Sequence, residues 1–99
     1  MSDIAMEDWA GEVGDRWLAH IDRFESMIAP IGIALLNAAD FNPGERVVDV
    51  GCGGGLTTLE IARRIGSDGR VTGIDIALQL ILAAEQRRAA AGATNIRFH

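Results

Sequence analysis

The residues best suited to chemistry lie in a short glycine-rich run, Gly51-Cys52-Gly53-Gly54-Gly55, which directly follows the apolar segment 46–50. Glycine has no Cβ, so its backbone adopts positive φ angles and approaches a ligand closely. The segment before the run is typical of a buried strand, and the pattern from about Leu56 is typical of a helix. A strand, a glycine turn and a helix in this order predict a loop that binds a nucleotide-type ligand.

The spacing of these glycines indicates which nucleotide is bound. The dinucleotide fingerprint G-x-G-x-x-G needs a third glycine at the position that Leu56 occupies here. Gly51, Gly53 and Gly55 follow the pattern G-x-G-x-G instead, and Asp49 stands two residues before the first of them. The pattern favours a ligand other than a nicotinamide dinucleotide, while a dinucleotide site and a turn with no ligand stay open as alternatives.

A second carboxylate, Asp75, ends the next expected strand, 24 residues after Gly51. This is close to the spacing of ~20 residues expected for an acid that binds a ribose. A carboxylate accepts hydrogen bonds from both ribose hydroxyls, which a neutral side chain does less well. Asp75 is therefore a candidate ribose ligand. Two interpretations of Asp49 stay open: part of the ligand site, or a side chain that only accepts hydrogen bonds from loop amides.

The elements that must position these residues follow from the apolar periodicity. The first forty residues are expected to be helical, and their apolar residues recur at steps of three and four along one helical face. Pro30 is expected to end this first helix or to begin the next, which then runs to about residue 39. The residues of the shared face are Trp17, Ile21, Phe24 and Ile28.

From residue 46 the pattern changes to alternating strands and helices. This β-α-β-α-β order predicts an α/β fold with a parallel sheet. We divide the chain into an N-terminal helical region at 1–42 and a ligand-binding half-domain at 43–99. The expected segments are a strand at 46–50, a helix from about 56 that stops at Gly66, a strand at 70–75, a helix at about 77–91 and the start of a strand at 95–98.

The predicted sheet is unusually small. Parallel sheets normally have more strands than this and are covered on both faces. With three strands, the first one, at 46–50, keeps an unpaired edge. We expect this edge, together with a sheet face that is only partly covered, to cause self-association or instability.

The run from Asp49 to Gly55 resembles motif I of the class I S-adenosylmethionine-dependent methyltransferases, whose commonest form is V-L-D-[VL]-G-C-G-x-G. Residues 75–89 are similar to the pattern D-[IV]-S-P-x-M-L-x-x-A-R-x-R of the same family, although Ala77 replaces the serine that would cap the helix. The resemblance implies the N-terminal half of this Rossmann-like methyltransferase fold. That half is a helical lid followed by β-α-β-α-β, truncated before strands four to seven.

The resemblance also implies a cofactor, S-adenosyl-L-methionine, and residues that hold it. Asp49 and the loop 51–55 would surround its methionine and sulfonium part, Asp75 would hold its ribose, and Ile76 and Leu80 would flank its adenine. The cofactor-binding residues implied in this way are Asp49, Gly51, Cys52, Gly53, Gly55, Asp75, Ile76 and Leu80.

The N-terminal region is similar to bacterial small-molecule methyltransferases of the ubiquinone/menaquinone C-methyltransferase type, through Trp9-Ala10-Gly11, Gly14-Asp15-Arg16-Trp17 and Asp22-Arg23. In such enzymes the N-terminal helices form a lid over cofactor and substrate, so Trp17 is a possible lid residue. The resemblance implies an enzyme that transfers a methyl group to a small molecule, with this chain as its cofactor-binding part. It indicates neither a catalytic residue nor the methyl acceptor.

Two alternatives to this function stay open. In the first, the chain is a non-catalytic fragment that binds the cofactor or assembles with itself. In the second, it is a fragment of an NAD(P)-dependent oxidoreductase.

Composition argues against several classes of protein. The net charge is −5 and the chain has no lysine, which argues against nucleic acid as a partner and fits a small-molecule acceptor. No apolar run reaches the ~20 residues of a membrane span, and residues 1–4 do not begin a secretory signal. A single cysteine cannot form an internal disulfide, which favours the cytoplasm.

Several reactive or charged residues have simpler interpretations. Cys52 is expected to be a small packing residue, not a nucleophile. His20 and His99 have no further ligand at usable spacing, so no metal site is expected. Arg87 and Arg88 are expected to form a surface pair near the end of their helix, where cations interact favourably with the helix dipole.

Overall fold

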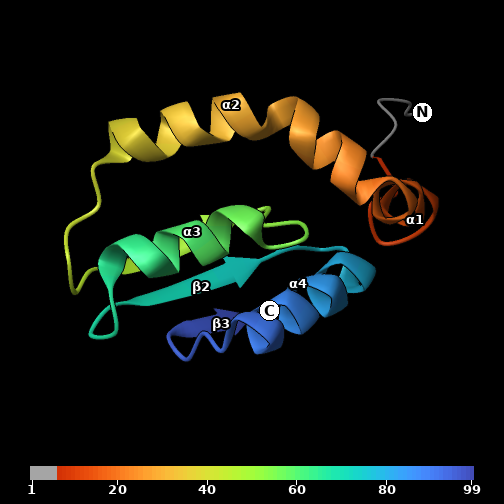
Figure 1. Ribbon diagram of the computed structural model, residues 1–99. Helices are drawn as coiled ribbons and strands as arrows, with labels where there is room; N and C mark the ends of the chain where they lie inside the picture. Colours follow the sequence, from red (N-terminus) through yellow and green to blue (C-terminus); the bar gives the residue numbers. More distant parts are fainter. Residues whose placement is uncertain (1–6) are drawn as a thin grey trace.

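The computed structural model describes residues 7–99, which fold into four helices and three strands (Figure 1). Residues 1–4, where no secretory signal is expected, lie outside this range. The order from β1 onward is β-α-β-α-β, which confirms the predicted α/β fold. Among residues 7–99, none of the helices combines the length and the apolar character that a membrane span requires. The elements are α1 (Glu12–Ala19), α2 (Ile21–Ala39), β1 (Arg46–Val50), α3 (Leu56–Ile65), β2 (Arg70–Ile74), α4 (Leu78–Ala91) and β3 (Ile96–Phe98).

The three strands form one parallel sheet in the order β1-β2-β3. Its register places Val47 beside Val71 and Val71 beside Ile96. Because side chains alternate along a strand, these three point to one face of the sheet. Asp49 and Gly73 are also register partners and lie on the same face, two residues further along. The register therefore brings the motif carboxylate to the carboxyl end of the sheet.

Helix α3 covers this face and forms the core with it. Ile61 and Ile65 of α3 are buried together with Val71 of β2, and Ile65 has no exposed surface. Burial of one such side chain contributes about 1.5–3 kcal/mol to folding. Leu36, near the end of α2, belongs to the same cluster. α3 ends before Gly66, whose φ of 74° confirms the predicted glycine stop.

The opposite face of the sheet is open in the described part of the chain. Val48 and Val50 of β1 are 59% and 79% exposed, and Ile74 of β2 is 40% exposed. Strand β1 pairs with β2 alone, so its outer edge has no partner within residues 7–99. This confirms the unpaired edge expected for the first strand.

The N-terminal helices break at His20, so the expectation of a break at Pro30 is wrong. The N–H of His20 donates to the carbonyl oxygen of Trp17, at 3.1 Å, and closes a tight turn between α1 and α2. Pro30 lies inside α2. A proline ring removes one backbone hydrogen bond from a helix interior. The alanine- and leucine-rich residues 34–39 favour helix strongly enough for α2 to continue past it.

Helix α1 lies beside the beginning of α4 (Figure 1), and Gln79 holds it there. Nε2 of Gln79 donates to the carbonyl oxygens of Trp9 (3.2 Å) and Gly11 (3.1 Å) and to Oδ1 of Asp15 (3.1 Å). Gly14 is buried at this contact. Only a glycine fits there, because a Cβ would overlap the Trp9 carbonyl oxygen and the Gln79 amide nitrogen. The backbone of α1 is thus packed directly on α4.

Two glycine-to-alanine substitutions in helices should change stability in opposite directions. Gly14→Ala forces a methyl group against the Trp9 carbonyl and should lower the free energy of unfolding by about 1–3 kcal/mol. Gly32→Ala in α2 meets no atom within 4 Å and should raise it by about 0.5–1 kcal/mol. Thermal melts followed by circular dichroism measure both changes. Equal melting temperatures for the two variants would contradict the close contact of α1 with α4.

Candidate nucleotide-binding site

The glycine-rich run turns the chain from β1 into α3, and its backbone explains three of the glycines. Gly51, Gly53 and Gly55 have φ angles of 73°, 55° and 83°, a region that other residues rarely adopt. The N–H groups of Gly51 and Cys52 donate to the carbonyl oxygen of Ile74, at 2.7 and 3.0 Å. The loop therefore folds around the carboxyl end of β2, next to the crevice in which open α/β sheets bind ligands.

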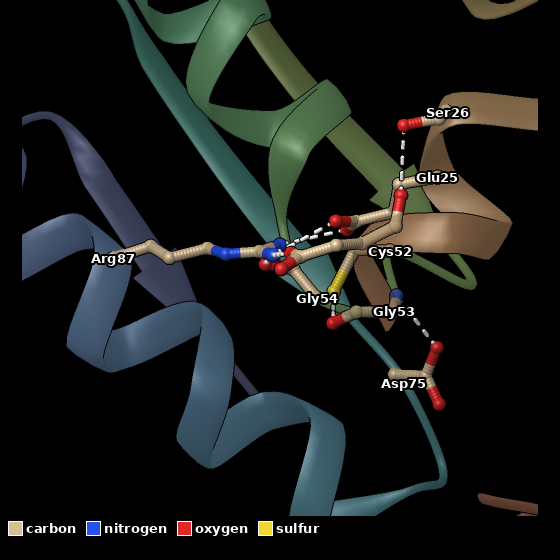
Figure 2. A network of polar contacts seen from close by, with 8 residues as sticks. Glu25, Ser26, Cys52, Gly53, Gly54, Asp75 and Arg87 are labelled. Carbon is tan, nitrogen blue, oxygen red and sulfur yellow. Dashed lines mark hydrogen bonds and ion pairs between the residues drawn. The ribbon is translucent and has the colours of Figure 1, made fainter. Parts of the chain in front are cut away.

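The Asp75 carboxylate, directly after β2, joins the loop to the next helix. Its Oδ2 accepts a hydrogen bond from the Gly53 N–H at 2.8 Å (Figure 2), and its Oδ1 accepts one from the Ala77 N–H at 2.8 Å. The Ala77 side chain provides no N-cap for α4, as predicted. The Asp75 carboxylate instead accepts a hydrogen bond from the backbone N–H of Ala77, just before the helix. Each carboxylate oxygen has a second lone pair, so Asp75 can accept further hydrogen bonds from a ligand.

The Asp49 carboxylate has a partner that sequence reasoning missed. Its Oδ2 accepts a hydrogen bond from the Thr58 hydroxyl at 2.7 Å, and Thr58 is completely buried in α3. Burial raises the pKa of Asp49, the Thr58 hydrogen bond lowers it in part, and the charge of Asp75 raises it further. The signal for Thr58 was weak, since it is simply a polar residue on the buried side of an otherwise apolar helix face.

The Cys52 side chain is buried and its thiol does not ionise readily. Burial, followed by the charges of Asp49 and Asp75, raises the pKa of Cys52 to about 11, so the thiol is protonated at neutral pH. A Cβ added to Gly73 would lie 3.0 Å from the Cys52 sulfur, which shows how closely that sulfur packs on β2. The observations describe a packing side chain.

A groove with a volume of about 1010 Å³ is bordered by the glycine loop and by the N-terminal helices. This volume is large enough for a nucleoside-sized ligand. Two residues of the predicted site, Asp49 and Gly55, do not line it. Ile76 is 74% exposed, whereas Leu80 is 2% exposed and offers the groove only a small part of its surface. The predicted residues in the wall are Trp17, Gly51, Cys52, Gly53, Asp75, Ile76 and Leu80.

Aromatic contacts place Trp17 in the groove wall. Its ring stacks on Phe24 of α2 at a centroid distance of 4.6 Å and meets the edge of Trp9 at 5.7 Å. Trp17 and Phe24 thus stay together although the helix breaks between them at His20. The His20 ring lies against the edge of Phe24, at 6.0 Å. No cluster of three or more metal-ligating side chains occurs in residues 7–99.

An ion pair between α2 and α4 corrects the expected role of Arg87. Arg87 is partly exposed and bridges two helices: its Nη1 donates to Glu25 Oε2 at 2.7 Å and its Nη2 donates to Glu25 Oε1 at 2.8 Å (Figure 2). Nη1 also donates to the Gly54 carbonyl oxygen at 2.9 Å. Arg88 pairs instead with Glu85 on its own helix. Glu25 and Arg87 are 62 residues apart, so no local pattern could have indicated their contact.

Comparisons with known proteins bear on this site. A family model described as a methyltransferase domain matches residues 41–99. The aklanonic acid methyltransferase of Streptomyces sp. is 33% identical over 97 residues, which cover 97% of this chain and 44% of that protein. A 2-phytyl-1,4-naphtoquinone methyltransferase of Nostoc sp. is 44% identical over 45 residues, which cover 46% of this chain and 20% of that protein.

A solved structure has the same fold. A SAM dependent methyltransferase from Aquifex aeolicus superimposes with a TM-score of 0.61 at 24% sequence identity, over 67% of this chain and 35% of that chain. The chain therefore spans less than half the length of each of these three relatives.

Replacement of Asp49 by asparagine should stabilise the free chain at neutral pH. The pKa of Asp49 is raised in the folded state, so the folded chain holds this proton more tightly and loses stability as the pH rises from the unfolded pKa through the folded one. Asparagine does not ionise and still accepts a hydrogen bond from Thr58. The variant's melting temperature should exceed that of the wild type at neutral pH. The difference should vanish near pH 3, where the protonated Asp49 of the wild type is as uncharged as the asparagine of the variant. A wild type that is the more stable protein at neutral pH would contradict this assignment.

Proposed function

The chain belongs to the methyltransferase-domain family, of the class I S-adenosylmethionine-dependent type, and we propose that it is the cofactor-binding part of an enzyme that methylates a small molecule. The position of Asp75 supports the proposal most strongly. Its carboxylate follows β2, lines the groove and is hydrogen-bonded to the glycine loop. A ligand in the groove can therefore contact the Asp75 carboxylate and, beside it, the backbone of the glycines of the loop.

The residues fit S-adenosylmethionine part by part. We assign the free lone pairs of Asp75 to the ribose hydroxyls, and we assign the exposed apolar surface of Ile76, with the small exposed part of Leu80, to the adenine. The loop 51–55 faces the methionine and sulfonium part, because its glycines allow close approach of the backbone. Asp49 lies outside the groove wall, so we assign it an electrostatic role: its negative charge favours the cationic sulfonium.

We further propose that the helical region at 1–42 is a lid and that residues 43–99 are the half-domain that binds the cofactor. Trp17 of α1 supports this division, because it comes from the helical region and yet lines the groove beside the loop. Glu25 of α2 lines the same groove. Both helices therefore contribute side chains to the site without belonging to the sheet that forms its base.

Bound S-adenosylmethionine supplies a methyl group whose leaving group is a neutral thioether, so the cofactor brings most of the reactivity. The chain has to hold the ligand in one orientation and to exclude water. Asp75 provides a charged group in the groove wall, and Trp9 and Trp17 provide aromatic rings in the same wall. We assign no general base among the described residues.

A small-molecule acceptor, not a nucleic acid, is the partner we propose. The net charge of −5 and the absence of lysine disfavour binding to a phosphate backbone. The relatives named for aklanonic acid and for 2-phytyl-1,4-naphtoquinone act on small molecules. The buried free thiol of Cys52 fits a reducing cytoplasm.

A cofactor-binding module without catalysis is a second candidate. It is favoured because the groups that we assign here, Asp75 and the loop 51–55, hold the cofactor, and none of them is assigned to the methyl acceptor. The remaining alternative, a fragment of an NAD(P)-dependent oxidoreductase, is overturned by the family membership.

Calorimetric titration with S-adenosylhomocysteine and with NADH tests the cofactor assignment. The wild type should bind the first and not the second, and Asp75→Ala should weaken binding by about tenfold or more, since charge-assisted hydrogen bonds are worth about 1.5–3 kcal/mol. Asp68→Ala is the matched control, because it removes the same charge from the turn before β2. Its affinity should equal that of the wild type. Binding of NADH alone would overturn the proposal.

An assay of methyl transfer distinguishes a methyltransferase from a cofactor-binding module without catalysis. Incubation of the chain with methyl-labelled S-adenosylmethionine and a set of small quinones and aromatic acids should transfer label to at least one acceptor. Retention of all label on the cofactor, with S-adenosylhomocysteine binding intact, would favour the non-catalytic module.

Self-association through β1 is a further part of the proposal. The outer edge of β1 has no partner within residues 7–99, and Val48 on its open face is 59% exposed. Sedimentation velocity should show a mass that rises with concentration, and Val48→Lys should shift the chain towards the monomer. Leu78→Lys, at a 65% exposed position on α4, removes similar apolar surface and should leave the mass unchanged. A wild type that is monomeric at all concentrations would contradict this association.

A further inference from the structure

Three segments that are distant in sequence meet at the guanidinium of Arg87. Arg87 extends from α4, Glu25 from α2, and Gly54 belongs to the glycine loop (Figure 2). We call this contact the Glu25–Arg87–Gly54 bridge. It is the point at which the proposed lid, the loop and the helix after β2 touch one another through polar groups.

The geometry of the bridge restricts how its two charged side chains can lie. The guanidinium and the Glu25 carboxylate form two parallel hydrogen bonds, at 2.7 and 2.8 Å, and the two side chains are only 26% and 12% exposed. Paired, partly buried charges with two hydrogen bonds hold a fixed relative orientation. The nearby Asp22 carboxylate lies 3.8 Å from Arg87 and is 98% exposed, so it adds little.

Gly54 differs from its neighbours in the reason why it lacks a side chain. Its φ angle is not in the left-handed region, whereas those of Gly51, Gly53 and Gly55 are. A Cβ at position 54 would lie 2.5 Å from Ile21 Cδ1, 2.7 Å from Arg87 Nη1 and 3.0 Å from Glu25 Oε2. The bare backbone at Gly54 is thus needed for close approach of the bridge and of α2.

The bridge also fixes one peptide group of the loop. The carbonyl of Gly54 accepts from Arg87, and the N–H of the same peptide group, on Gly55, donates to the Cys52 carbonyl oxygen at 3.0 Å. One residue earlier, the Gly53 N–H donates to Asp75. The loop is therefore held from two sides, by Arg87 of α4 and by the carboxylate proposed to bind the ribose.

We propose that Arg87 is a positioning residue: through Glu25 and the Gly54 carbonyl it couples the position of the α2 lid to the conformation of the glycine loop, and so to cofactor affinity. The inference rests on the proposed cofactor site. When the bridge is formed, α2 is held against the loop and Glu25 completes the groove wall. When it is broken, α2 moves away and the peptide group after Gly54 loses one of its two partners.

Two variants break the bridge by different routes. Arg87→Gln removes the ion pair and the donor to Gly54, whereas Gly54→Ala keeps every charge and displaces Arg87 and Ile21 with a methyl group. Asp22→Asn is the matched control, because it removes a charge next to Arg87 without removing a hydrogen bond of the bridge. All are compared by calorimetry with S-adenosylhomocysteine at a temperature where melts show each protein fully folded.

Both bridge variants should weaken S-adenosylhomocysteine binding by about tenfold, the size expected for the loss of one hydrogen bond to a charged group. The control should stay within about twofold of the wild type. Without ligand, hydrogen exchange at the Gly55 amide should accelerate in both bridge variants and not in Asp22→Asn. A bridge that only stabilised the fold would lower the melting temperature and leave affinity and Gly55 exchange of the folded protein unchanged. That result would overturn the proposal.

The two proposals fail in different ways. If the wild type binds no S-adenosylhomocysteine, the proposed function is wrong. The exchange rate of the Gly55 amide still tests the coupling of α2 to the loop in that case. A wild type that binds, with bridge variants of equal affinity, removes the bridge proposal alone. If Arg87→Gln does not fold, Gly54→Ala gives the same test, because its methyl group fits once α2 has moved away.

Discussion

The site depends above all on one carboxylate at the carboxyl end of β2, which is hydrogen-bonded to the loop that leaves the neighbouring strand β1. Neighbouring parallel strands end at the same edge of a sheet, so the loop that leaves β1 has to pass beside the end of β2. Asp75 stands at that end and accepts N–H donors from the loop, at Gly53, and from the start of α4, at Ala77. Loss of the carboxylate would leave both donors without a partner in a partly buried place, at about 1–3 kcal/mol each. The side chain that holds the loop in the free chain is thus the one that we propose as the ribose ligand.

The glycines around this carboxylate meet two separate physical requirements. In the loop, Gly51, Gly53 and Gly55 provide positive φ angles. Gly73 on β2 provides space, since a Cβ there would lie 2.7 Å from the Phe98 ring and 3.0 Å from the Cys52 sulfur. The first requirement shapes the turn, and the second lets the turn pack on the sheet. An alanine at either kind of position would disturb the site, through backbone strain in one case and overpacking in the other.

Local signals in the sequence predicted the elements well where one residue type determines a boundary. Gly66 and Gly92 end α3 and α4 with φ angles of 74° and 66°, as their spacing indicates. The prediction from Pro30 was wrong because it used the local signal alone. The helix-favouring residues after Pro30 outweigh the tendency of proline to break a helix. Contacts that need the tertiary fold were invisible. Arg87 meets Glu25 only because the fold brings the side chains of α4 and of the first part of α2 together, and the hydroxyl of Thr58 points to Asp49 only because α3 lies on β1.

Charge at the site favours a cationic ligand over an anionic one. Asp49 and Asp75 both raise the pKa of Cys52, so the two carboxylates act on the same small volume. The cation in the groove wall, Arg64, is paired with Glu60, and Arg87 beside the loop is paired with Glu25. A pyrophosphate would add two negative charges to this volume, whereas a sulfonium adds a positive one. Burial disfavours the ionised form of Asp49, and a cation nearby favours it, so ligand binding and ionisation of Asp49 should support each other. The carboxylate that weakens the free fold thus becomes favourable when the sulfonium is bound.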